Sequence, residues 1–506
     1  MGNILLKNAV SNVTAKVWSI ISLYLFVPFW IDYLGVEGYG VISFYTILMT
    51  LMAFADAGLS ATLTREFAKV EPFETYREDL LRTIEAVYVA IALIIGCGIY
   101  LLAPYITSTF LKSETIPVAS LVGYVRIMAP ILSFNFLYML YTGGLIGLQK
   151  QVLSNTLNIG YSISRSALVL IALYFVPTVD IFLYWQLLSI IAVTVLSRFY
   201  LKQFVDTGSK KPKFHFDYLK DVWKYALGMM AMAIISSLNT QLDKLVVGNI
   251  LSVKEMGFYS LAGTIGQAVL FITAPLGIAF YPELTKLISC GNRERTEEYF
   301  YMFAFIVSSL SSCIGLTLFF YIDELTTLWL KDSIVPFITI PARLLILGNI
   351  FMSLQYSVYY LAIAHGHTKT NVFLGSFMLL LTIPSVFWLT REYGLNGAAM
   401  PYLFLNVIAT VCLGGVIMNK FLKHQFKKWL MYSCIPLCVC TLFMLISYYL
   451  VTNMHLGEIG TLALGCMVSI ITGYVLLVLF YRLFPECFQY RFFNRISLII
   501  PDKFRK

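Results

Sequence analysis

The chain is divided into apolar stretches that are each long enough to cross a lipid bilayer. A helix needs about 20 residues to span roughly 30 Å of hydrocarbon, and fourteen stretches of the 506-residue sequence meet this length. They lie near 9–33, 39–64, 81–104, 118–147, 152–176, 179–202, 221–249, 257–282, 298–321, 335–364, 370–390, 395–419, 429–450 and 459–482. Because 59% of all residues are hydrophobic and only 12% are charged, the sequence predicts an all-α polytopic membrane protein.

The first twelve predicted helices form two sets of six that repeat at a spacing of 217 residues. The segment LGVEGYG at 34–40 aligns without gaps on LSVKEMG at 251–257, and the same offset pairs Arg126 with Arg343. This order predicts two six-helix lobes related by a parallel internal repeat. The expected divisions are an N-lobe at 1–203, a cytoplasmic linker at 204–220, a C-lobe at 221–420, and helices 13 and 14 with a cytoplasmic tail at 421–506.

Basic residues are distributed unequally between the connections on the two sides of the predicted membrane domain. Of the 36 Lys and Arg residues, only Lys112, Lys254, Lys331 and Arg391 fall in the odd-numbered connections. Because short cytoplasmic loops carry the excess of Lys and Arg, we expect both termini to be cytoplasmic. The net charge of +9 is therefore interpreted as a consequence of topology, and the basic tract at 210–213 as a contact for anionic lipid rather than nucleic acid.

Several classes of protein are disfavoured by what the sequence lacks. It contains no Walker loop, dinucleotide fingerprint or Gly-x-Ser-x-Gly elbow, so we expect no enzyme activity and no cofactor. The nine cysteines lie mostly within apolar helices, which predicts neither a disulfide framework nor a metal site. Lys7 and Lys16 flank a first apolar segment without a small-residue cleavage site, so helix one is expected to remain as an anchor.

Cations outnumber acids inside the predicted helices. A lone arginine in hydrocarbon costs roughly 2.5 to 3.5 kcal/mol, so it is retained where it faces protein, water or an anion. The intramembrane cations are Lys16, Arg126, Arg165 and Arg343. The obvious intramembrane acids are Asp56 and Asp243. This balance predicts a cationic cavity and an anionic substrate, with structural ion pairs as the alternative.

Polar residues recur on single faces of three predicted helices. Helix five carries such a stripe at Asn155, Asn158, Ser162 and Arg165, with intervals of three and four residues. Helix one has Asn12 and Lys16 at similar spacing, and helix seven has Asn239, Asp243 and Lys244. We expect these stripes to line the same cavity. The alternative for any single residue is a hydrogen bond between helices.

The order of several loose motifs carries a resemblance to a known family. The motifs are LGVEGYG at 34–40, FADAGLSATLTREFAK at 54–69, GGLIGLQKQVLSNTLNIGYSISR at 143–165, LDKLVVGNILSVKEMGFYSLAG at 242–263, APLGIAFYPELTKL at 274–287 and EYGLNGAAMPYL at 392–403. Over nearly its whole length the chain resembles Wzx-type flippases, which move O-antigen, capsule or related repeat units. These flippases belong to the multidrug/oligosaccharidyl-lipid/polysaccharide exporter superfamily.

The resemblance implies a V-shaped pair of lobes around a central cavity, with alternating access and with helices 13 and 14 outside. It also implies a substrate made of an oligosaccharide on undecaprenyl pyrophosphate. Arg126, Arg165 and Arg343 would then bind the diphosphate, since arginine engages phosphate oxygens with two parallel hydrogen bonds. Tyr138, Tyr141 and Tyr356 are weaker candidates for stacking on sugar rings.

The resemblance further implies a bacterial inner membrane protein with membrane lipids, a polysaccharide polymerase and chain-length machinery as partners. Transport would be coupled to a proton or sodium gradient, or driven by consumption of the product outside. Asp56, Glu85 and Asp243 are the acids placed to take part in ion coupling.

Three alternatives stay open. A multidrug or cation antiporter of the same superfamily ought to have intramembrane carboxylates in excess of arginines, which is the opposite of the observed balance. A lipid II flippase would share the fourteen helices and the cationic cavity, and would differ in its sugar contacts. A membrane glycan polymerase would need a large outer loop with arginines, whereas Arg391 is the only arginine in a predicted outer loop.

Overall fold

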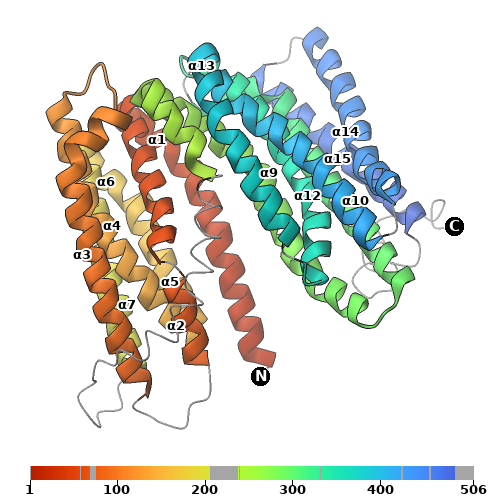
Figure 1. Cartoon of the computed structure of the whole chain (residues 1–506). Coiled ribbons are helices and arrows are strands. Elements are labelled where there is room, and N and C mark those ends of the chain that lie inside the picture. The colour runs from red at the N-terminus through yellow and green to blue at the C-terminus, as the bar shows by residue number, and fades with distance from the viewer. Residues whose placement is uncertain are drawn as a thin grey trace. The chain divides into compact units, whose positions relative to one another are not determined.

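The computed structural model describes residues 2–56, 58–68, 76–205, 238, 240–330, 332–367, 369–422, 425–454 and 457–484. All regular structure in these ranges is helical, so the predicted all-α fold is confirmed (Figure 1). The elements are α1 (Gly2–Asp56), α2 (Leu59–Ala68), α3 (Tyr76–Phe110), α4 (Val118–Gly147), α5 (Gln151–Ile163), the π-helix η1 (Ser164–Leu168), α6 (Val169–Phe175), α7 (Val179–Val205), α9 (Val253–Ser289), α10 (Arg293–Phe320), α11 (Ile322–Trp329), α12 (Val335–Ala364), α13 (Lys369–Phe421), α14 (Phe426–Met454) and α15 (Glu458–Leu483).

Within the described ranges, eleven helical segments are long and apolar enough to cross a membrane. The segments in α1 and in α13 each cover two predicted spans. The eleven segments therefore correspond to all of the predicted spans except the seventh. Most of the seventh span, near 221–249, lies outside the described residues, although 240–250 are helical. The prediction of one helix at 39–64 is wrong, since α1 ends at Asp56 and α2 begins at Leu59.

Two glycines interrupt the helical backbone inside α1 and α13. Gly35 has φ 71° and Gly394 has φ 59°, and both lie in connections that the sequence analysis placed between consecutive spans. Other residues adopt such positive φ values at a cost of roughly 1–2 kcal/mol, because their Cβ approaches the following carbonyl oxygen. The helices are therefore separated by a single left-handed residue rather than by a polar loop.

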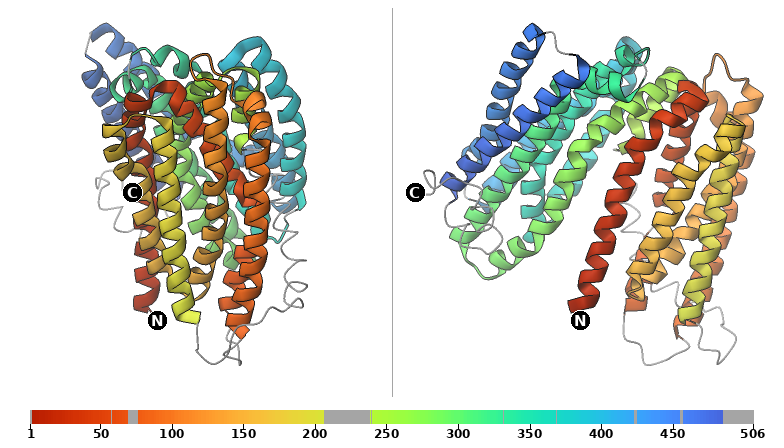
Figure 2. Two further views of the ribbon diagram at one scale, coloured as in Figure 1. Left: turned by 90° about the vertical axis from the view of Figure 1, so that its left-hand side faces the viewer. Right: turned by 180° about the vertical axis from the view of Figure 1, so that it is seen from behind.

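The chain forms two compact units, Met1–Gly257 and Phe258–Lys506. In the first unit α4 packs against both α3 and α7, and the helices of this unit run roughly parallel (Figure 2, left). The shared core of α3, α4 and α7 also includes α2, and it contains the fully buried side chains of Phe67, Tyr88 and Phe136. Most of the predicted linker at 204–220 lies outside the described residues, so the lobe boundaries stay predictions.

Equivalent positions of the sequence repeat contact each other within the first unit. Gly40 and Gly257 differ by the repeat spacing, and each faces the backbone of the other segment. A Cβ on Gly40 would lie 2.0 Å from the carbonyl oxygen of Val253, and a Cβ on Gly257 would lie 2.7 Å from that of Val36. Side chains would force these segments apart, so glycine at both positions allows the start of α9 to pack directly on α1.

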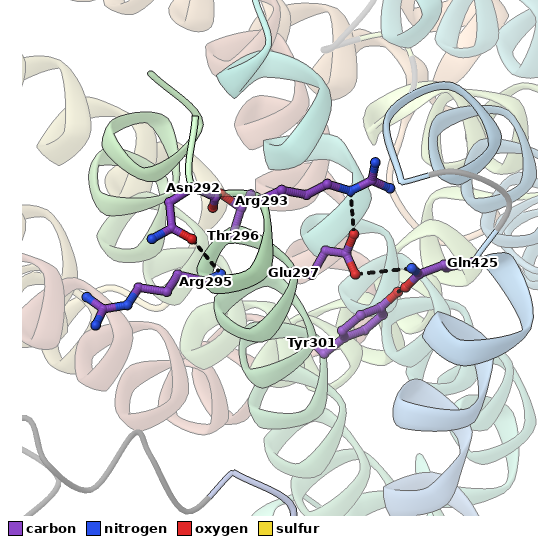
Figure 3. A network of polar contacts seen from close by, with 7 residues as sticks. All are labelled: Asn292, Arg293, Arg295, Thr296, Glu297, Tyr301 and Gln425. Atoms are coloured by element: carbon purple, nitrogen blue, oxygen red, sulfur yellow. Dashed lines mark hydrogen bonds and ion pairs between the residues drawn. The ribbon is translucent and has the colours of Figure 1, made fainter. Parts of the chain in front are cut away.

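In the second unit, α10 contacts α12, α14 and α15. Asn292 caps the start of α10 by accepting a hydrogen bond from the backbone N–H of Arg295 at 3.2 Å. Figure 3 shows the adjoining network that ties this end of α10 to the start of α14. Glu297 accepts hydrogen bonds from Arg293 at 2.8 Å and from Gln425 at 3.1 Å, and the Tyr301 hydroxyl donates to Gln425 at 2.5 Å.

Candidate functional site

A group of polar side chains gathers around η1 in the first unit. Arg165 belongs to η1 itself, Tyr161 to α5, Tyr138 to α4, and Tyr45 to the second half of α1. These four residues are called the Arg165 cluster below. The guanidinium carbon of Arg165 lies 5.6 Å from the centre of the Tyr161 ring. The rings of Tyr138 and Tyr161 have centroids 5.8 Å apart. The four side chains therefore form one contiguous group.

The local geometry at Arg165 follows from the π-helical turn. One turn of π-helix changes the hydrogen-bond register, so carbonyl groups lose their usual i+4 donors. Side chains of α7 supply replacements: Trp185 donates to the carbonyl oxygen of Ser164 at 2.8 Å, and Gln186 donates to that of Arg165 at 2.9 Å. These bonds hold the backbone of Arg165 against α7, while its side chain extends toward the tyrosines.

The side chains of the three tyrosines are buried. Tyr45 is 1% exposed, Tyr161 7% and Tyr138 9%. The hydroxyls of Tyr45 and Tyr161 lie close enough to interact electrostatically with Arg165. Arg165 is partly buried, and no described carboxylate forms an ion pair with it. The cluster therefore has an excess of positive charge among the described residues.

The structure brings together the polar stripes predicted on helices one and five. Asn155 donates hydrogen bonds to the side-chain oxygens of Asn12 at 2.5 Å and Ser11 at 3.1 Å. On the same faces, Asn158 and Lys16 are exposed and Ser162 is partly buried, and Lys16 has contacts of its own. Whether these stripes line a transport cavity stays a prediction.

The two arginines matched by the repeat have different surroundings. Arg126 is exposed on α4, and its guanidinium carbon lies 5.1 Å from the centre of the Tyr100 ring. No described carboxylate forms an ion pair with it. Arg343 instead donates to Asp323 at 2.7 Å and to the carbonyl oxygen of Phe319 at 3.2 Å.

The repeat itself explains this difference. The position equivalent to Asp323 in the first half is Ile106, which offers no charge to Arg126. A comparison of positions 106 and 323 in the sequence would have shown that Arg126 lacks the acidic partner that Arg343 has. Of the two arginines, only Arg126 keeps its charge unpaired among the described residues.

The acids predicted for ion coupling divide into two kinds. Glu85 is paired with Arg198 at 2.6 Å and Lys202 at 3.8 Å, and it accepts a hydrogen bond from Tyr141 at 2.8 Å. Asp56 is buried, and it accepts hydrogen bonds from the hydroxyls of Tyr88 and Ser60, the latter at 2.7 Å. Glu85 therefore holds helices together, whereas the described partners of Asp56 are uncharged.

The residues predicted on helix seven are only partly described. Asp243 and Lys244 are partly buried, and the carboxylate of Asp243 accepts the backbone N–H of Lys244 at 2.8 Å. Asn239 lies outside the described residues. Tyr141 contacts Glu85, which gives that ring a structural role in the first unit.

Two residues of the Arg165 cluster, Tyr45 and Tyr161, were missed in the sequence analysis. Tyr161 precedes Arg165 by one helical turn, a spacing that places both residues on one face and could have identified it. Tyr45 reaches the cluster from a segment more than a hundred residues away, and no local pattern connects the two.

Comparison with known proteins assigns the chain to a family. The model of the family described as polysaccharide biosynthesis protein matches residues 5–288, which is more than half of the chain. The chain belongs to this family. A Shigella flexneri protein named "Putative O-antigen transporter" is 23% identical to this polysaccharide biosynthesis protein over 381 residues, which are 73% of this chain and 87% of that protein.

Solved structures share the fold of this family member. The lipid II flippase MurJ in an inward closed conformation is 14% identical, with a TM-score of 0.70 over 94% of this chain and 98% of that chain. An inward-facing multidrug resistance transporter of the MATE family, from the MOP superfamily, is 12% identical, with a TM-score of 0.63 over 83% of this chain and 96% of that chain. These likenesses show that the chain shares its fold with these transporters.

Proposed function

We propose that the protein flips oligosaccharide repeat units, linked to undecaprenyl pyrophosphate, from the cytoplasmic to the outer leaflet of the bacterial inner membrane. Transport would proceed by alternating access and supply cell-surface polysaccharide synthesis. Both termini would be cytoplasmic, and a polymerase and chain-length machinery would use the product. The name of the Shigella flexneri relative and the family description support a polysaccharide substrate.

The observation that carries the proposal is the charge of the Arg165 cluster. Arg165 lies within a membrane-spanning segment without a described carboxylate partner, and Arg126 is a second arginine of this kind. Unpaired cations at such depth are expensive unless an anion or water meets them. An anionic lipid headgroup supplies that partner during transport, whereas a cationic drug would be repelled. This distinction favours a flippase over a multidrug antiporter.

The flipping activity can be tested without any substitution. In the native host, removal of the gene should abolish surface polysaccharide and cause the lipid-linked intermediate to accumulate on the cytoplasmic leaflet. The wild-type chain should reverse both changes. If removal left surface polysaccharide and intermediate unchanged, the proposed function would be wrong. If the chain instead supported growth of cells that lack their lipid II flippase, lipid II would be its substrate.

The contribution of the two arginines is tested by Arg126→Gln, Arg165→Gln and the double substitution. A hydrogen bond to a charged group contributes roughly 1.5–3 kcal/mol, so each change should lower the transport rate about tenfold or more at equal amounts of membrane protein. Lys286→Gln removes one positive charge from an exposed pair with Glu283 and is the matched control. Normal export by the double variant would exclude both arginines from headgroup binding.

A further inference from the structure

We propose that Cys313 and Cys440 form a site of reversible oxidation, at which a disulfide bond fastens α14 to α10. The two cysteines come from different helices of the second unit, and their sulfur atoms lie 3.5 Å apart. The sequence analysis predicted no disulfide framework, because nothing in the spacing along the chain brings residues of these two helices together. This site does not depend on the proposed function.

The contacts between α10 and α14 keep a nearly constant register, with paired residues 124 to 127 positions apart in the sequence. Before the cysteines in both helices, the hydroxyl of Ser308 donates to the carbonyl oxygen of Ser433. After them, the hydroxyl of Thr317 contacts the sulfur of Met444 at 3.9 Å. The same register continues toward both helix ends, at Tyr301 with Gln425 (Figure 3) and at Tyr321 with Ser447. The flanking contacts therefore hold the two thiols opposite each other.

A second pair of cysteines on α14 lacks the geometry for this reaction. Cys434 and Cys438 are one helical turn apart, and residues four apart on a helix have Cβ atoms about 5–6 Å from each other. A disulfide needs Cβ atoms about 3.5–4.5 Å apart and sulfur atoms about 2.05 Å apart. The sulfur atoms of Cys313 and Cys440 are already in contact, so rotation about their Cα–Cβ bonds supplies the remaining approach. Oxidation should therefore select this pair.

Burial sets the order of the reaction. Cys440 is 0% exposed and Cys313 is 9% exposed, so a small oxidant meets Cys313 first. Hydrogen peroxide converts the thiolate of Cys313 to a sulfenic acid and releases hydroxide, which takes up the proton lost by that thiol. The sulfur of Cys440 then attacks the sulfenic sulfur, and the hydroxyl leaves as water with the proton of Cys440. In total, two thiols lose two electrons and two protons, and one peroxide becomes two water molecules.

The depth of Cys313 in the membrane favours the oxidised form. The predicted span within α10 starts near residue 298 on the predicted cytoplasmic side, and Cys313 lies about 22 Å further along at roughly 1.5 Å per residue. In a hydrocarbon core about 30 Å thick, this position is in the outer half. Thiol reductants keep disulfides rare in the cytoplasm, whereas disulfides persist in oxidising compartments outside it. A disulfide at Cys313 is therefore remote from the reducing side.

The test maps disulfide bonds in the purified full-length protein after treatment with hydrogen peroxide. Mass spectrometry of the unreduced monomer should find the peptides of Cys313 and Cys440 linked, and dithiothreitol should separate them. Oxidation should also raise the melting temperature by several degrees, because the bond limits how far α10 and α14 separate on unfolding. Reduction should reverse this rise. Oxidation of Cys290, which is exposed, shows that the peroxide dose was sufficient.

Serine substitutions separate this pair from the other cysteines. Cys313→Ser and Cys440→Ser should each abolish the linked peptide and the reversible rise in melting temperature. Cys434→Ser is the matched control, because it makes the same change in the same helix, and it should behave like wild type.

Mapping of the wild-type protein decides the proposal even if a serine variant fails to fold. The oxidation site is wrong if no linked peptide forms at a dose that oxidises Cys290, or if the link joins a different pair of cysteines. It is also wrong if the bond between Cys313 and Cys440 lowers the melting temperature, since the helices would then have to be distorted to form it.

Discussion

At the scale of single residues, the buried carboxylates of Asp56 and Glu85 differ in their partners. Glu85 is neutralised by Arg198 and Lys202. Asp56 is held by the hydroxyls of Tyr88 and Ser60 and by the Ser60 backbone N–H at 3.3 Å. A buried carboxylate whose described partners are uncharged keeps an uncompensated charge, whereas one paired with two cations does not. Asp56 is therefore the better candidate for coupling transport to protons.

We predict that Asp56→Asn keeps the fold and abolishes transport driven by a proton gradient. The amide oxygen of asparagine can still accept a hydrogen bond from Tyr88, while the side chain can no longer exchange a proton. The measurement is flipping of lipid-linked substrate in proteoliposomes with and without an imposed pH gradient. A variant whose flipping still accelerates with the gradient would rule out Asp56 as the coupling group.

Glu85→Gln serves as the contrasting variant. It leaves Arg198 and Lys202 without their carboxylate, so its main effect should be a lower melting temperature rather than altered coupling. Unchanged stability in this variant would show that the Glu85 contacts contribute little to the fold.

At the scale of elements, the pairs of spans within α1 and α13 are separated by one residue of positive φ. The sequence analysis ended one predicted span and began the next on either side of Gly35 and of Gly394. It could not predict that the break would be so short, because that depends on backbone dihedral angles. Neither glycine has a neighbouring atom within 4 Å of the position that a Cβ would occupy, so backbone conformation alone requires glycine there.

We predict that Gly35→Ala and Gly394→Ala each destabilise the protein by about 1–2 kcal/mol, because alanine is strained at positive φ. Gly98→Ala and Gly375→Ala are the matched controls. These glycines lie inside helices with equally open surroundings, where alanine is favoured by up to about 1 kcal/mol. Thermal unfolding of the purified protein measures both sets. Equal melting temperatures for the two sets would contradict the role assigned to Gly35 and Gly394.

At the scale of the whole molecule, the distribution of basic residues predicts which connections face the cytoplasm. The described structure contains eleven membrane-spanning candidates, and both ends of the chain are predicted on the cytoplasmic side. Cys290 follows α9 in a predicted cytoplasmic connection and is exposed. Glu114 is exposed in a connection predicted to face outward. These two positions therefore report on opposite sides of the membrane.

We predict that a membrane-impermeant maleimide labels Cys290 only after the inner membrane is opened. The experiment uses a variant in which the other cysteines are replaced. In the same background without Cys290, Glu114→Cys should be labelled in intact cells whose outer barrier, if present, has been removed. Labelling of Cys290 in intact cells would reverse the predicted orientation.

Much of the fold could be predicted because the membrane imposes strong local rules. Each span needs about 20 apolar residues whose backbone groups bond within the helix, so hydropathy locates spans without tertiary information. The same rules did not reveal the break between α1 and α2 near Asp56. Nor could they reveal the π-turn at Ser164–Leu168, since its carbonyl groups depend on donors from α7.

The sequence by itself determined the helical class, the order of the spans, the repeat and the presence of intramembrane arginines, because each depends on composition or spacing along one segment. Tertiary structure decided what those arginines contact. Arg343 meets Asp323, Arg126 meets the ring of Tyr100, and Arg165 meets Tyr45 of α1 and Tyr161 of α5. Whether a charged side chain inside a membrane is paired depends on groups from segments that are distant in the sequence. Only the packing of the helices brings those groups next to it.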